Sequence, residues 1–130
     1  MANPHVLTNV QYDLPGKRFI CTLTVAATET ASSIFMGFKP KVVKMTQIAG
    51  SPDATSRSVG YDQMTAAYAV LVAAAGDLTI ITSNGYTFLD GTEASPAQAC
   101  TGSPGSSGPG VTIGTGVTAN SLVYLFEAYG

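Results

Sequence analysis

Hydrophobic and polar residues alternate along several short stretches of the chain, which is the pattern of strands that bury at least one face. The clearest stretch covers residues 19–27, where Phe19, Cys21, Leu23 and Val25 occupy one face. Other stretches are rich in β-branched residues and are bounded by turn residues. On these patterns, strands are predicted over 19–27, 34–38, 41–49, 58–64, 78–82, 86–89, 111–114 and 122–129.

Residues 65–75 fit two kinds of structure. Their alanines favour a helix by propensity, but Gly76 and Asp77 follow directly and lead into the strand predicted at 78–82. We therefore predict a strand at 65–75, with a helix as the alternative. Residues 83–85, Ser-Asn-Gly, are a strong hairpin signal, so residues 86–89 are expected to pair back across this turn.

The two least periodic segments lie near the ends of the chain. Residues 1–16 hold two prolines and a glycine around a short apolar stretch, and we expect an extended N-terminal arm. Residues 102–110 are almost entirely Gly, Ser and Pro, which predicts a flexible loop. Residues 17–130 are then a single all-β domain. About eight short strands separated by turns indicate a β-sandwich or a jelly roll.

Charged residues are scarce. Only 14 of the 130 residues are Lys, Arg, Asp or Glu, which is 11%, against about 25% in an average soluble domain. A folded monomer of this mass exposes roughly 6,400 Å², or about 450 Å² for each charge. Such a surface must be covered by neutral polar groups or hidden in an assembly. The 16 Thr, 11 Ser and 14 Gly supply part of the neutral cover.

This composition argues against several classes of protein. A net charge of −2 with six basic residues does not supply the basic stripe that nucleic-acid binding requires. The longest weakly polar run, residues 66–76, is shorter than the ~20 residues of a membrane span. Residues 1–5 have neither the basic nor the apolar region of a secretory signal. We therefore expect neither a nucleic-acid nor a membrane partner, and synthesis in the cytoplasm.

The sequence offers little catalytic or metal-binding chemistry. Cys21 and Cys100 are the only cysteines, and Cys21 falls on the predicted core face, so we expect two unpaired thiols. With one histidine, the usual ligands of a zinc site are missing. That histidine, His5, lies in the expected arm, away from a serine or aspartate arranged to activate a nucleophile. No Gly-x-Ser-x-Gly elbow is present. We expect no enzyme activity and no cofactor.

Two short motifs have simpler explanations than the chemistry they suggest. Residues 114–119, GTGVTA, match the letters of a dinucleotide-binding motif, but that motif requires a following helix and strands are predicted on both sides. A glycine-rich turn is the better interpretation. Asp90 and Glu93 are too few for a calcium loop and are not placed across a cleft as in a glycosidase. We expect a solvated turn.

One local cluster is basic. Lys39 and Lys41 are predicted to share a strand face while Lys44 points to the other, so the three do not form one patch. Lysines that protect an edge strand from aggregation are the expected interpretation, with contact to an acidic protein partner as the alternative. The nearby aromatic residues are expected in the core, although Phe35 and Phe38 flank a glycine and are alternatively a subunit contact. Tyr61 is grouped with them as a core residue.

Several short motifs resemble small structural proteins of tailed bacteriophages, namely the head decoration, or cement, proteins. The resemblance covers residues 35–130. It rests on the motifs Gly37–Lys44 (GFKPKVVK), Asn84–Thr87 (NGYT) with Asp90–Gly91, Val111–Gly114 (VTIG), and the ending Asn120–Tyr124 (NSLVY) with Glu127–Ala128.

The resemblance implies a compact β-sandwich or jelly roll on the virion surface that binds the major capsid protein and clamps neighbouring subunits together. It also implies a homotrimer whose N-terminal arm reaches over adjacent subunits, and the 102–110 loop at an exposed tip or a subunit junction. The residues expected to contact the capsid or another subunit are His5, Val6, Leu7, Tyr12, Phe35, Phe38, Lys39 and Lys41.

Two other functions are compatible with this sequence. The first is a receptor- or carbohydrate-binding module of a phage tail or fibre. Sugar sites usually present aromatic platforms beside polar groups, and the chain has no tryptophan. The second is a self-assembling coat or tube subunit.

Overall fold

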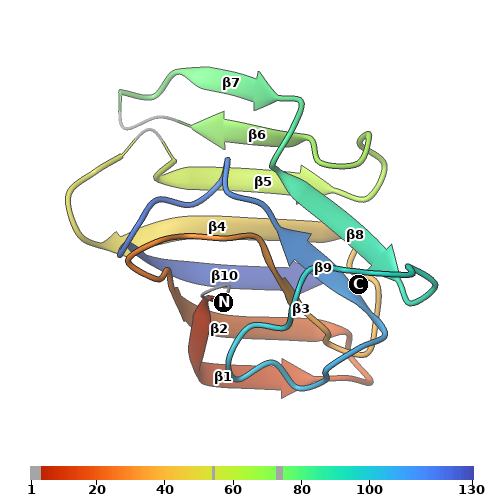
Figure 1. Cartoon of the computed structure of the whole chain (residues 1–130). Helices are drawn as coiled ribbons and strands as arrows, with labels where there is room; N and C mark the ends of the chain where they lie inside the picture. The colour runs from red at the N-terminus through yellow and green to blue at the C-terminus, as the bar shows by residue number, and fades with distance from the viewer. Residues whose placement is uncertain (1–3, 54, 73–74) are drawn as a thin grey trace.

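The structure, a computed structural model, describes residues 4–53, 55–72 and 75–130 (Figure 1). Within these residues the chain forms ten β-strands in two antiparallel sheets, and no helix long and apolar enough to cross a membrane occurs among them. Figure 1 shows the smaller sheet in front of the larger one. The predicted all-β class is confirmed, and the architecture is that of a β-sandwich.

The larger sheet has seven strands, and the order of its strands differs from their order in the chain. That order is β1 (Val6–Asp13), β2 (Arg18–Thr24), β10 (Val123–Tyr129), β4 (Val42–Ala49), β5 (Arg57–Tyr61), β6 (Ala69–Val72) and β7 (Leu78–Ile81). The last strand of the chain is thus inserted between β2 and β4. Strands β4 to β7 form a meander, and β1 and β7 are the two edges of the sheet.

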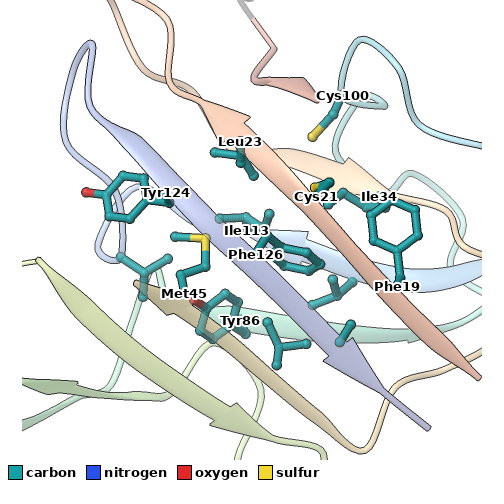
Figure 2. Close-up of a cluster of buried hydrophobic side chains, with 14 of the residues drawn as sticks. Phe19, Cys21, Leu23, Ile34, Met45, Tyr86, Cys100, Ile113, Tyr124 and Phe126 are labelled. Atoms are coloured by element: carbon teal, nitrogen blue, oxygen red, sulfur yellow. The ribbon is translucent and has the colours of Figure 1, made fainter. Parts of the chain in front are cut away.

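The smaller sheet has three strands, in the order β3 (Ser32–Ile34), β9 (Pro109–Ile113) and β8 (Tyr86–Asp90). Alternating residues from both sheets fill the space between them. Phe19 and Phe126 pack edge to face, with ring centroids 6.1 Å apart. Ile34, Tyr86 and Ile113 meet them from the smaller sheet, and Figure 2 shows these side chains directed into one cluster. The core therefore lies between the sheets, and the other face of the larger sheet is left to solvent.

The expected N-terminal arm is a strand of the larger sheet. Residues 6–13 form β1, which pairs antiparallel with β2, opposing Leu7 to Leu23 and Tyr12 to Phe19. The register shifts between Thr8 and Gln11, next to the positive φ of 52° at Asn9. This β-bulge interrupts the alternation of inward and outward side chains that identifies a strand in a sequence. Residues 6–13 therefore show no sustained alternation of hydrophobic and polar residues.

The predicted hairpin at residues 83–85 is wrong. Strand β8 does not pair back on β7 but joins β9 in the smaller sheet. The backbone N–H of Gly85 donates to the carbonyl of Ala67 at 2.9 Å, and the N–H of Tyr86 donates to that of Tyr68. These bonds hold the turn against the 65–68 loop, so the chain crosses from one sheet to the other.

The strand prediction for residues 65–75 is confirmed over 69–72, which form β6, and is wrong over 65–68, which form a loop. Residues 73 and 74 lie outside the described residues. The 102–110 loop is tied to the domain. Gly105 N–H donates to the carbonyl of Phe35 at 3.0 Å, and Ser103 Oγ accepts from the N–H of Phe35 at 3.0 Å. Its last two residues begin β9. The loop therefore lies along the chain that follows β3.

Candidate functional site

Half of the predicted contact residues are buried within the domain. His5 is 0% exposed, and Leu7, Phe35 and Phe38 are at most 6% exposed. The core prediction for Phe35 and Phe38 is confirmed. These four side chains support the fold, and they offer no surface to a partner.

His5 is a buried histidine without a side-chain partner. Its backbone is held on both sides, because the N–H donates to Ser32 Oγ at 3.3 Å and the carbonyl accepts from the N–H of Thr101 at 2.9 Å. Neither ring nitrogen has a hydrogen-bond partner among the described residues. Burial lowers the pKa of the imidazole to about 4. The ring is therefore neutral at pH 7 and acts as a packing group.

Cys21 and Cys100 are both buried and both free thiols. The thiol of Cys100 donates to Ser32 Oγ at 3.3 Å. Burial raises the pKa of Cys21 to about 12, with a contribution from Cys100, and burial raises that of Cys100 to about 11. Buried protonated thiols are poor nucleophiles. Among the described residues no group of three His, Cys, Asp or Glu side chains is placed to hold a metal ion.

The two motifs that were predicted to be turns, Asp90 with Glu93 and residues 114–119, lie in turns. Asp90 accepts from the N–H and the hydroxyl of Thr92, at 2.9 and 2.6 Å, and these bonds lower the pKa of Asp90. Glu93 accepts from the N–H of Gly91 at 3.1 Å. At 114–116 the N–H groups of Gly114 and Gly116 donate to the 84–85 turn. The two carboxylates therefore bond within their own turn, and the two glycine N–H groups bond to a second turn.

The accessible members of the predicted contact set are Val6, Tyr12, Lys39 and Lys41. Tyr12 is 41% exposed, yet its ring packs edge to face on Phe19 and its hydroxyl donates to the carbonyl of Met36. An exposed aromatic that is fixed in this way can bind without losing much rotamer freedom.

Lys39 and Lys41 stand on either side of the buried Pro40, before β4 begins at Val42. Lys39 and Lys41 therefore lie outside the strand, and the prediction that they share a strand face is wrong. Lys44 lies in the interior strand β4 and so does not protect an edge. Tyr61 is 48% exposed, and its predicted place in the core is wrong.

The structure reveals an exposed apolar surface that sequence reasoning missed. On β5, β6 and β7 the aliphatic residues that alternate with the core positions are Val59, Val70, Val72, Leu78 and Ile80, called here the aliphatic patch; Arg57 and Tyr61 lie on the same face at the two ends of β5. Val59 opposes Val70, which opposes Ile80, and Val72 opposes Leu78. Opposed residues share one face of a sheet. Leu78 is 72% and Ile80 is 62% exposed, so the patch lies open at one end of the sheet.

The signal for this patch was present in the sequence. Residues 70–72 and 80–81 are apolar on both faces of their strands, a pattern usually found in strands that are covered on both sides. Within the described residues, Ala69 and Leu71 on one side of β6 are buried in the core, while Val70 and Val72 on the other side are half-buried.

Comparison with known proteins found no matching family model, no matching curated protein and no matching solved structure.

Proposed function

We propose that this chain is a structural protein of a tailed-phage virion, a decoration protein that binds the major capsid protein and bridges neighbouring capsid subunits. The observation that best supports this is a domain with few charges whose seven-stranded sheet leaves one broad face and the β7 edge uncovered among the described residues, while the start of the β1 edge is bridged to Thr101. Exposed apolar patches and open sheet edges are characteristic of surfaces that bind other proteins.

The accessible contact residues suggest how the capsid is bound. Tyr12 is the fixed aromatic anchor, and Val6 lies on the outward face of the same edge strand. Lys39 and Lys41 present two ammonium groups to an acidic partner. Buried aromatic anchors surrounded by polar groups contribute most of the free energy in protein interfaces. The protein would act as a clamp, because each bound copy adds buried area across a capsid seam.

Aromatic placement favours this function over carbohydrate binding. The two exposed tyrosines are Tyr12 and Tyr61. Tyr12 lies on the core side of the larger sheet, opposite Phe19, whereas Tyr61 alternates with Gly60 and faces away from the core. Residues on opposite faces of a sheet do not make one stacking platform for a sugar.

The test mixes purified protein with undecorated capsids and measures the amount that sediments with them. We expect saturable binding, with the bound ratio reporting the trimers that the resemblance implies. The double variant Lys39→Glu/Lys41→Glu should weaken binding at least tenfold, while Lys17→Glu, an exposed lysine in the β1–β2 turn, should not. Removal of residues 1–16 is a poor test, because it also removes β1 and the buried Leu7.

Failure to bind capsids, together with binding to a glycan array, would replace the decoration function with the carbohydrate-binding one. Failure of both, with growth of the pure protein into long assemblies, would favour a coat or tube subunit.

A further inference from the structure

We propose that His5 is an acid-sensitive latch for the start of the larger sheet. At neutral pH its buried ring helps to hold residues 4–8 on the domain, and protonation of the ring releases this segment while the rest of the β-sandwich stays folded. The inference does not depend on the proposed function, because it concerns the free protein and a side chain that is 0% exposed.

The ring of His5 lies in an environment that suits only its neutral form. Neither ring nitrogen has a hydrogen-bond partner among the described residues, so a proton added there would create a buried cation without an acceptor. Burial of an unpaired charge is strongly unfavourable, and burial is the cause of the lowered pKa of this imidazole. The charged ring therefore gains most by moving into water, which requires the backbone around His5 to move with it.

The elements around His5 offer its charged form no counter-charge. Asp13 opposes Arg18 at the far end of the β1–β2 pair, and Glu29, which precedes β3, accepts from the hydroxyl of Thr118. Burial raises the pKa of both cysteines, so they are neutral at pH 7 and below. The titratable side chains of β1, β2, β3 and the 99–101 segment are Tyr12, Asp13, Arg18, Cys21 and Cys100.

The β-bulge divides β1 into two halves that are held differently. Beyond the bulge, Tyr12 packs on Phe19 and its hydroxyl bonds to the backbone, which anchors the second half. Before the bulge, only His5 and Leu7 are buried among residues 5–8. A segment at a sheet edge with few buried side chains can open without unfolding the domain. The bulge is therefore the hinge at which the first half separates.

Release of residues 4–8 uncovers the thiol of Cys100. This thiol and the backbone N–H of His5 both donate to Ser32 Oγ, each at 3.3 Å, so Cys100 lies beside the segment. The N–H of Leu7 donates to the carbonyl of Thr101 at 2.8 Å, which holds the segment over the chain next to Cys100. Cys100 is 3% exposed while the segment is in place. Its reactivity therefore reports the opening.

Proton linkage sets the size of the effect. The pKa of His5 is about 4 in the closed state, against an ordinary value of 6.5 that we expect in the released segment. The open state therefore binds the proton more tightly, and opening becomes more favourable as the pH falls from 6.5 to 4, with no further change below 4. Between pH 7.5 and pH 4.5 the opening equilibrium should rise about 70-fold.

The test measures how fast the thiol of Cys100 reacts with 4,4′-dithiodipyridine, a disulfide reagent that also labels thiols in acid. The thiol sulfur displaces one 4-thiopyridone, which takes up the thiol proton, and peptide mass spectrometry identifies the labelled cysteine. Dividing the rate by that of the urea-unfolded chain at the same pH gives the protection of Cys100. We expect this protection to fall about 70-fold from pH 7.5 to pH 4.5. Low urea concentrations should hardly change it, because local opening exposes little surface.

Two variants separate the latch from a general effect of acid. His5→Phe keeps an aromatic ring and His5→Gln keeps a neutral polar side chain, and neither titrates. In whichever of them folds by circular dichroism, the protection of Cys100 should fall far less than in the native chain. Three results would overturn the proposal: equal protection at both pH values in the native chain, an equal fall in the native chain and the variants, or labelling at pH 4.5 that rises with urea as steeply as global unfolding does.

Discussion

The hydroxyls of Ser58 and Tyr86 lie 2.6 Å apart in the fully buried interior and share a hydrogen bond. Ser58 belongs to β5 of the seven-stranded sheet and Tyr86 to β8 of the three-stranded sheet, so this bond joins the two layers. Burial raises the pKa of Tyr86, and the phenol therefore stays protonated throughout the physiological range.

This bond predicts a non-additive pair of substitutions. Tyr86→Phe leaves the buried Ser58 hydroxyl without its partner, and Ser58→Ala does the same to the phenol, so each should cost about 1–3 kcal/mol. The double variant removes both polar groups and should cost less than the sum of the two. Urea unfolding of the four proteins measures the coupling. Strictly additive losses would mean that the bond does not contribute to stability.

Gly60 is predicted to be intolerant of any side chain. A Cβ atom at this position would lie 2.5 Å from Cδ2 of the Tyr86 ring, so Gly60→Ala forces the ring to move within a packed core. Overpacking of this kind costs about 1–3 kcal/mol. In the background of Tyr86→Val, which removes the ring, the same substitution should cost much less. An equal loss of unfolding free energy in both backgrounds would contradict this explanation.

His5 predicts a dependence of stability on pH. Its pKa is about 4 in the folded protein, against an ordinary value of 6.5, so the unfolded chain binds a proton first as the pH falls. The contribution of His5 is complete above pH 6.5, declines between pH 6.5 and 4, and falls no further below pH 4. The loss is about 3 kcal/mol in total.

The measurement compares unfolding free energies of the native chain and of His5→Phe at pH 7.5 and pH 4.5. The carboxylates titrate in both proteins, so the difference between the two isolates the histidine. The native chain should lose more stability than the variant. If both lose the same amount, the buried ring does not cause the acid sensitivity.

Much of the fold follows from local patterns in the sequence. The strand containing Phe19, Cys21 and Leu23 is buried on the face that its alternation indicated. The strand at 69–72 also follows, although its alanine-rich surroundings favour a helix by propensity, because it pairs on both sides with strands that are themselves clear.

What local patterns did not reveal depends on contacts between distant residues. The turn at Asn84 and Gly85 has the composition of a hairpin, but hydrogen bonds to the 65–68 loop direct the chain to the other sheet. His5 is polar and near the terminus, yet Ser32 and Thr101 hold it in the interior. No short window of sequence contains these partners. Four expected contact residues, His5, Leu7, Phe35 and Phe38, are buried because distant parts of the chain cover them.

The decoration function is tested most directly by the occupancy of undecorated capsids after addition of the pure protein, counted by electron cryo-microscopy. We expect density for this β-sandwich at symmetry-related positions that bridge adjacent capsid subunits, with Lys39 and Lys41 at the contact. Capsids that stay bare at saturating protein concentration would contradict it.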